Sequence, residues 1–309
     1  MVVRVRSPGG LVEGVARFLD YLEVEKGASA NTIAAYRNDL QQLIDFVGGK
    51  LGRQATWEDV SRRLLEEFVL ELRRRGYRES SIARRIAAMR SFFSFLAAEE
   101  IISHNTGESL ASPKVRRTLP KAISPTEVDE LLEQPAHRQT PEAKRDQAML
   151  ELLYATGMRV SELISLDVDD VHLGPAPFVR CRGKGGKERA IPIHDQAAEA
   201  LRSYLEEGRP FLLKDKKEKA LFLNRRSERL TRQGFWLILK GYARQAGLGN
   251  KVTPHTLRHS FATHMLRGGM PLRDLQELLG HASISTTQVY THLTRDHLRE
   301  VYQRSHPRA

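Results

Sequence analysis

Apolar side chains recur at helical spacing along the first hundred residues of the chain. In residues 11–24, for example, Val15, Phe18 and Leu22 would share one face of a helix. The same spacing continues in three further stretches. The pattern predicts a domain of four helices with short connections, over residues 11–24, 31–47, 60–75 and 80–96.

Capping residues and glycines indicate where these helices begin and end. Ser29 or Asn31 can cap the second helix, and the glycine pair at 48–49 is predicted to end it. Thr56 and Asp59 have the spacing of a capping box and are predicted to precede the third helix.

The helical pattern stops after residue 106, and a basic, proline-containing stretch predicts an extended linker over 107–122. Structure restarts at Ser124, which can cap a helix that has Pro125 at its first position and Glu127 at its third. We therefore expect an N-terminal domain over 1–106 and a second domain over 123–309.

The second domain is predicted to be mainly helical with one small antiparallel sheet. Residues 178–182 and 187–193 alternate with a period of two on either side of a glycine turn that contains Lys184, which is typical of a hairpin. The remaining pattern predicts helices over 125–133, 142–156, 160–166, 196–207, 232–246, 254–267, 272–279, 283–292 and 295–304.

The charge balance favours a polyanionic partner, because the formal net charge is +11, with 49 Lys and Arg against 38 Asp and Glu. A cluster of arginines crosses the junction between the third and fourth helices, where it could contact a phosphate backbone from two elements. An ordinary solvated helix face is the alternative interpretation. The cluster contains Arg73, Arg74, Arg75, Arg84, Arg85 and Arg90.

Cysteine and hydropathy exclude several other classes. The single cysteine, Cys181, cannot form an intramolecular disulfide or a cysteine-based zinc site. No apolar run approaches the roughly 20 residues of a membrane span, and residues 1–10 lack the apolar stretch of a signal peptide. A reducing, cytoplasmic location without membrane attachment is therefore expected.

Two segments near the C-terminus combine phosphate-binding side chains. Thr253 and Pro254 begin a helix, so His255 and Arg258 fall in its first turn, beside free backbone N–H groups that favour anions. His255 and His259 have spacing that a metal could use. However, the residue after His255 is a threonine, where the zinc-protease motif has glutamate, so no metal site is expected.

The second segment spans 278–292. Gly280 is predicted to end one helix, His281 to occupy the turn, and Tyr290 to lie two turns into the next helix. A tyrosine in a helix is ordinarily a core residue, so its role depends on the groups that accompany it.

Four ordered blocks together resemble the tyrosine recombinases, and within them the Xer-type chromosome-dimer resolvases. The resemblance covers nearly the whole chain. The blocks are ATGMRVSEL at 155–163, GKG at 183–185, HTLRHSFATH at 255–264, and the segment from Leu279 through His281 to Tyr290. It implies a C-shaped clamp, in which a SAM-like core-binding domain precedes a catalytic domain.

The resemblance also implies roles for six residues. Arg159 and Arg258 would bind the scissile phosphate, and Lys184 would protonate the departing 5′-oxygen. His255 would assist removal of the tyrosine proton, and His281 would donate a hydrogen bond to a phosphate oxygen. Tyr290 would be the nucleophile that forms a 3′-phosphotyrosyl link, with no metal or other cofactor. Because free tyrosine has a pKa of about 10, it needs such a base or a positive field.

The partners implied by the resemblance are double-stranded DNA at a specific site and a homo- or hetero-tetramer on two such sites. The last helix would dock on a neighbouring subunit, with packing on its own chain as the alternative, and a DNA translocase could act as activator. The alternatives for function are an integrase, transposon recombinase or relaxing topoisomerase of the same chemistry, or a non-catalytic DNA-binding protein.

Overall fold

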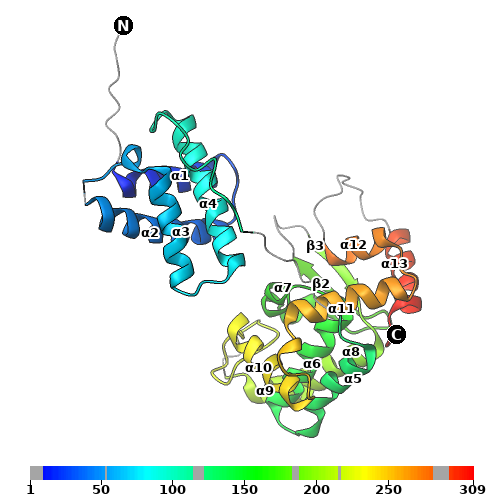
Figure 1. Ribbon diagram of the computed structural model, residues 1–309. Coiled ribbons are helices and arrows are strands. Elements are labelled where there is room, and N and C mark those ends of the chain that lie inside the picture. The colour runs from blue at the N-terminus through cyan, green and yellow to red at the C-terminus, as the bar shows by residue number, and fades with distance from the viewer. Residues whose placement is uncertain (1–9, 53, 114–121, 183–187, 215–216, 281–291) are drawn as a thin grey trace. The chain divides into compact units, whose positions relative to one another are not determined.

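The structure, a computed structural model, describes residues 10–52, 54–113, 122–182, 188–214, 217–280 and 292–309. The chain divides into two compact units, residues 1–118 and 119–309, and each has its own hydrophobic core. Both units are mainly helical, as predicted (Figure 1).

Four helices form the N-terminal unit: α1 (Leu11–Val24), α2 (Ala30–Leu51), α3 (Arg62–Arg74) and α4 (Glu79–Ala98). Their inward faces meet in a core rich in aromatic rings, where Phe18 and Trp57 each contact Phe92. Leu110 is 1% exposed and packs in the same core, so packing continues beyond residue 106, where the sequence pattern placed the end of the domain.

Two helix boundaries in this unit differ from the sequence-based expectation. Helix α2 continues through the glycine pair at 48–49 and ends at Leu51, where Gly52 is the C-cap residue with a φ of 90°. The capping box of Thr56 and Asp59 caps a short 3-10 turn, Trp57–Asp59, whereas Ser61 caps α3. Capping signals therefore identified real turns but assigned one of them to the wrong helix.

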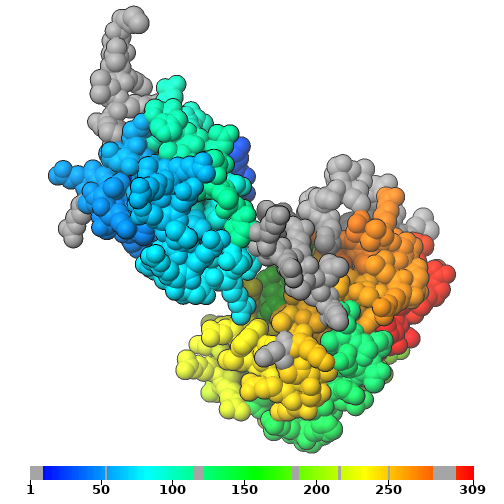
Figure 2. All heavy atoms as spheres, viewed as in Figure 1, coloured from blue at the N-terminus to red at the C-terminus, as the bar shows by residue number. Residues whose placement is uncertain are grey.

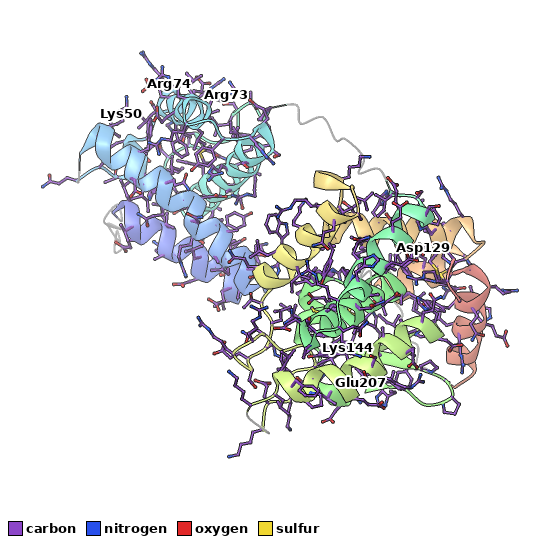
Figure 3. All side chains as sticks on the ribbon, turned by 90° about the horizontal axis from the view of Figure 1, so that it is seen from below. Lys50, Arg73, Arg74, Asp129, Lys144 and Glu207 are labelled. Atoms are coloured by element: carbon purple, nitrogen blue, oxygen red, sulfur yellow. The ribbon has the colours of Figure 1, made fainter. Side chains whose placement is uncertain are left out.

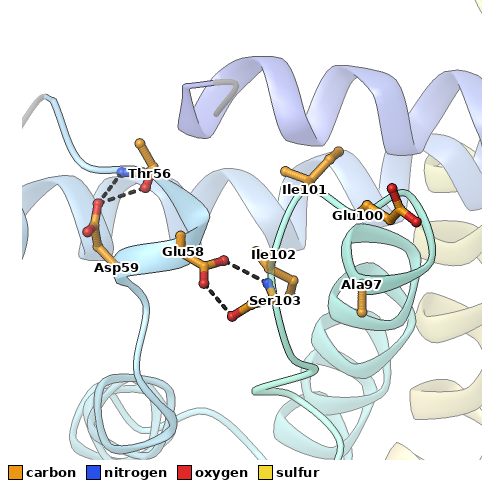
Figure 4. A pocket seen from close by; sticks show the side chains of 8 residues that line it. All are labelled: Thr56, Glu58, Asp59, Ala97, Glu100, Ile101, Ile102 and Ser103. Atoms are coloured by element: carbon orange, nitrogen blue, oxygen red, sulfur yellow. Dashed lines mark hydrogen bonds between the residues drawn. The ribbon is translucent and has the colours of Figure 1, made fainter. Parts of the chain in front are cut away.

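A carboxylate ties that 3-10 turn to the segment after α4. Glu58 accepts hydrogen bonds from the backbone N–H of Ser103, at 2.9 Å, and from its hydroxyl (Figure 4). The open pocket at this junction is also lined by Asp59 and Glu100. Three carboxylates at one pocket make this end of the helical unit a poor surface for DNA.

The second unit is built around α6 (Pro141–Thr156), which is buried on nearly every side. The other helices are α5 (Pro125–Glu133), α7 (Val160–Ser165), α8 (Asp195–Ser203), α9 (Arg209–Leu212), α10 (Arg232–Gln245), α11 (Pro254–Arg267), α12 (Leu272–Leu279) and α13 (His292–Ser305). A π-helical turn, Tyr204–Gly208, continues α8, and Glu207 in this turn pairs with Lys144 of α6 (Figure 3).

The predicted antiparallel hairpin is present as β2 (Phe178–Arg182) and β3 (Glu188–Pro192). A two-residue strand, β1 (Val171–His172), adds to β2, giving the order β1-β2-β3. In the register of the hairpin Cys181 lies opposite Arg189. The turn that contains Lys184 lies outside the described residues.

The last helix, α13, packs on its own unit. Val301 and Tyr302 are 2% and 1% exposed, and the hydroxyl of Tyr302 donates to the carbonyl of Ala155 at 2.9 Å. His297 of α13 faces Asp274 of α12 at 3.7 Å, and the two helices are neighbours in Figures 1 and 2. In the single chain its apolar face is buried against α11, and docking of this helix on a neighbouring subunit stays a prediction.

No helix within the described ranges is long and apolar enough to cross a membrane.

Candidate active site

The turn between α6 and α7 presents Arg159. Gly157 ends α6 in the left-handed conformation, with a φ of 57°, and a Cβ there would lie 2.2 Å from a ring carbon of Phe261. Arg159 is then the N-cap residue of α7, and its backbone N–H donates to the carboxylate of Glu162 at 2.7 Å. The turn therefore fixes the backbone of Arg159 while its side chain stays 47% exposed.

The first turn of α11 supplies Arg258. Thr253 caps this helix by accepting from the N–H of Thr256, as the sequence predicted. The guanidinium of Arg258 donates to the carbonyl of Gly157 at 2.6 Å and to that of Leu279 at 2.9 Å. Arg258 thus binds the turn before Arg159 to the C-terminal end of α12, whose last carbonyls have no partner within the helix.

Arg159 and Arg258 lie close enough to influence each other. Burial, and then the positive charge of Arg159, lower the pKa of Arg258 to about 10. The guanidinium of Arg258 therefore remains protonated at neutral pH, although it is half-buried beside Arg159. Two like charges held together favour an anion between or beside them.

His255 shares the first turn of α11 with Arg258, as the spacing predicted, and its side chain is exposed. Its ring is therefore accessible to a ligand at this helix N-terminus.

Glu162 is a member of the site that the sequence did not single out. It is 6% exposed and accepts from the backbone of Arg159, from the Arg159 guanidinium at 3.3 Å, and from both terminal nitrogens of Arg189 at 3.0 Å. Burial by itself would raise the pKa of Glu162, but the hydrogen bonds from Arg189 and from the Arg159 backbone outweigh it, so the pKa is lowered. Glu162 is ionised at neutral pH.

Arg189 was also missed. It lies on β3, its side chain is 9% exposed, and its Nε donates to the carbonyl of Leu278 at 2.9 Å. A signal existed, because Arg189 alternates with Ile191 and Ile193, whose side chains are both buried. An arginine at a core-facing position requires a buried anionic or carbonyl partner.

The electrostatic balance of this cluster is positive. Arg159, Arg189 and Arg258 surround Glu162, which is the one carboxylate among their described partners. Three guanidiniums and one carboxylate give this partly buried cluster a net charge of +2. Such a site can bind a phosphate diester and stabilise added negative charge on it.

Three of the predicted site residues, Lys184, His281 and Tyr290, lie outside the described residues. The structure does describe their neighbours along the chain. Strands β2 and β3 flank the turn of Lys184, and α12 ends at Gly280, in the left-handed conformation with a φ of 66°, directly before His281. Arg189 donates to the carbonyl of Leu278 and Arg258 to that of Leu279, the two residues directly before Gly280.

The N-terminal arginines fall into two groups. Arg73 and Arg74, both labelled in Figure 3, and Arg75 lie exposed at the end of α3. Among the described residues, their ion-pair partners are Glu71 and Glu79. Arg84 is half-exposed and makes a two-point ion pair with the buried Asp39.

Two other members of the predicted cluster serve the fold. Arg85 is 5% exposed, contacts Asp39 and Gln42, and stacks over the Tyr77 ring at 4.3 Å. Arg90 donates to the carbonyl of Leu110. We therefore leave Arg85 and Arg90 out of the proposed DNA contacts.

Within the ranges that the structure covers, no group of three His, Cys, Asp or Glu side chains has the geometry to hold a metal ion.

Comparison with known proteins places the chain in a defined family. The phage integrase family model matches residues 121–297, and the model of the phage integrase N-terminal SAM-like domain matches residues 15–100. The tyrosine recombinase XerC of Herpetosiphon aurantiacus is 56% identical over 280 residues, which cover 91% of this chain and 90% of that protein. The tyrosine recombinase XerD of Oceanobacillus iheyensis is 48% identical over 94% of this chain and 97% of its own length.

Solved structures agree on the fold. A XerH site-specific recombinase bound to a palindromic difH substrate, in a post-cleavage complex, matches with a TM-score of 0.71 and 23% identity over 94% of each chain. A lambda integrase tetramer bound to a Holliday junction matches with a TM-score of 0.67 and 18% identity, over 91% of this chain and 81% of that chain.

Proposed function

The chain belongs to the phage integrase family of site-specific tyrosine recombinases, and from this premise we propose that it cleaves and rejoins DNA through a 3′-phosphotyrosyl link to Tyr290. The observation that carries this proposal is the convergence of Arg159 and Arg258 on one site with excess positive charge. All six proposed site residues lie within the segment 121–297 that matches the family model.

The charge of the site suits the transition state. A phosphodiester carries one negative charge, and an attacking tyrosine oxygen brings a second as its proton leaves. The cluster of Arg159, Arg189, Arg258 and Glu162 has two positive charges to offset them. Because guanidiniums supply this stabilisation, the proposed reaction requires no metal ion.

The proposed chemistry proceeds in two balanced steps. The phenol oxygen of Tyr290 attacks the scissile phosphorus, His255 accepts the phenol proton, and the bond from phosphorus to the 5′-oxygen breaks. Lys184 donates a proton to that 5′-oxygen, and His281 donates a hydrogen bond to a phosphate oxygen. A 5′-hydroxyl from another strand then attacks the phosphotyrosine while Lys184 takes up its proton, and His255 returns a proton to the departing oxygen of Tyr290, which restores a phosphodiester and releases the tyrosine.

We further propose that the substrate is a dif-type site and that the biological outcome is resolution of chromosome dimers. The similarity to XerC and XerD recombinases supports this choice. Four copies on two duplexes, of this chain alone or with a related recombinase, would form the active assembly. A DNA translocase is a candidate activator of that assembly.

A nicked suicide duplex tests the cleavage step. On such a substrate the fragment beyond the cleavage site diffuses away, so the covalent intermediate accumulates and is visible on a denaturing gel. We expect an adduct with the wild-type protein and none with Tyr290→Phe, although the variant still binds the duplex. An adduct of normal yield with Tyr290→Phe would contradict the assignment.

A further inference from the structure

The carboxylate of Glu162 is shared unequally by two arginines. Arg189 holds both of its oxygens, each at 3.0 Å, whereas the guanidinium of Arg159 makes a single contact at 3.3 Å. Arg189 and Glu162 are 9% and 6% exposed, but Arg159 is 47% exposed. The buried pair is therefore the strong one, and the exposed arginine is held weakly.

The fold cannot easily dispense with Glu162. It occupies the third position of α7 and accepts a hydrogen bond from the backbone N–H of Arg159 at 2.7 Å, which is the carboxylate half of a capping box. The same carboxylate, however, competes with a phosphate for the guanidinium of Arg159. Because Glu162 is buried, solvent and salt would screen that competition only slightly.

We propose that Arg189 is a positioning residue for strand cleavage: it occupies and neutralises the Glu162 carboxylate, which leaves the Arg159 guanidinium available to the scissile phosphate. This inference rests on the proposed function, because it assumes that Arg159 binds that phosphate. Arg189 itself touches no reacting atom. It acts through Glu162.

The same side chain reaches a second part of the site. Its Nε donates to the carbonyl of Leu278 at 2.9 Å, at the end of α12. A Cβ on Gly280 would lie 2.9 Å from the Nη1 atom of Arg189, so the absence of a side chain there lets the guanidinium pass. Arg189 therefore joins β3, the start of α7 and the end of α12.

Two roles can be separated by experiment: neutralising Glu162, or merely tying three segments together. Arg189→Met and Arg189→Gln remove the charge, and the freed Glu162 should then draw Arg159 away from the phosphate. We expect adduct formation on the suicide duplex to slow by about 100-fold, the scale of a displaced catalytic group. DNA affinity should change only a few-fold, because exposed phosphate contacts elsewhere are retained.

The double variant Glu162→Gln/Arg189→Met distinguishes the two roles. It keeps an amide oxygen that can cap α7, but it removes the competing carboxylate together with its partner. Neutralisation predicts that the rate recovers to within about tenfold of wild type, since replacing both members of a buried pair is far less harmful than removing one. If Arg189 merely connects the three segments, the rate should not recover, because that connection is absent from Arg189→Met and from the double variant alike.

Arg189→Lys keeps the positive charge but cannot keep both paired contacts and the bond to Leu278. It should stay within about tenfold of wild type if charge is what matters. Arg180→Met is the matched control, because Arg180 lies in the same sheet and pairs with the buried Asp170 at 3.3 Å. Its rate per folded molecule should equal that of wild type.

All rates are measured at saturating protein and divided by the folded fraction from thermal unfolding. The proposal is supported if the charge-removing variants are slow while Arg189→Lys and the double variant recover. The proposal is overturned if the double variant is as slow as Arg189→Met and Arg189→Gln. It is also overturned if Arg189→Met and Arg189→Gln are as fast as wild type. Absence of an adduct with the wild-type protein would instead refute the proposed function.

Discussion

In the N-terminal unit, arginines such as Arg62 and Arg75 each face a glutamate one helical turn away, and both partners are substantially exposed. In the second unit, residues 119–309, which we call the catalytic unit, Arg159 and Arg189 share one buried carboxylate. Arg258 donates to carbonyl oxygens in the same unit. Exposed pairs contribute little and are screened by salt, whereas a half-buried excess of charge acts strongly on an anion. Arginines that add surface charge are therefore distinct from arginines that form a site.

The largest effect should follow from removing a guanidinium of the catalytic cluster. Arg258→Ala deletes the guanidinium that we propose binds the scissile phosphate, and it also frees the carbonyls of Gly157 and Leu279. We expect adduct formation to fall by about 100- to 1,000-fold, as when one donor to a developing charge is removed. A single-turnover gel assay on the suicide duplex measures it. A decrease below about tenfold would contradict the distinction between the two kinds of arginine.

The next effect concerns an arginine of the N-terminal unit that behaves as a core residue. Arg85→Met removes the interactions with Asp39 and Gln42 and the stack on Tyr77, while Arg84 still pairs with Asp39. The free energy of unfolding should fall by about 1–3 kcal/mol, with DNA affinity nearly unchanged. Denaturant titration and a binding isotherm check the two parts, and weaker DNA binding at unchanged stability would count against it.

A smaller effect is expected from the exposed arginines at the end of α3. Replacing Arg73, Arg74 and Arg75 by alanine should weaken DNA binding and lower the slope of log affinity against log salt by up to about one for each phosphate that is no longer neutralised. Stability should change by no more than about 0.5 kcal/mol. An unchanged salt slope would show that this surface does not meet DNA.

The smallest effect is a pH dependence confined to the catalytic unit. Burial first, and then neighbouring positive charge, lower the pKa of His194 to about 4 and that of His306 to about 3. Both folded values lie below the ordinary value of about 6.5, so the unfolded chain binds more protons and stability falls as pH drops below that value. Burial raises the pKa of Glu151 to about 7, which opposes this decrease in part.

Two histidines should outweigh one carboxyl group, so the melting temperature of the catalytic unit should fall by about 5 °C from pH 6.5 to pH 5. Calorimetry across that range measures it. His306→Leu should flatten the dependence, and a variant with the wild-type pH slope would show that His306 is not responsible for it.

Much of the architecture could be predicted because the signals are local. Ser124 and Glu127 form the predicted capping box at the start of α5, Gly157 ends α6, and β2 and β3 pair as a hairpin. The spacing of apolar residues in a helix or strand involves only residues close together in the chain, so a single sequence is enough to predict these elements.

The remainder depends on contacts between distant residues. Arg189 and Glu162 are 27 positions apart. The alternation of β3 indicates that Arg189 needs a buried partner, but nothing in the local pattern identifies Glu162 as that partner. Arg84 and Arg85 are adjacent on α4, yet one is half-exposed and the other buried beside Asp39. Helical spacing placed both arginines in one cluster but could not separate their surroundings.

The identity of the linked residue tests the central claim most directly. The adduct is trapped on a suicide duplex in the presence of EDTA, digested with protease and nuclease, and sequenced by mass spectrometry. We expect a 3′-nucleotide phosphate on Tyr290 and on no other residue. A nucleotide attached elsewhere, a 5′-linkage, or disappearance of the adduct in EDTA would contradict metal-independent transfer through Tyr290.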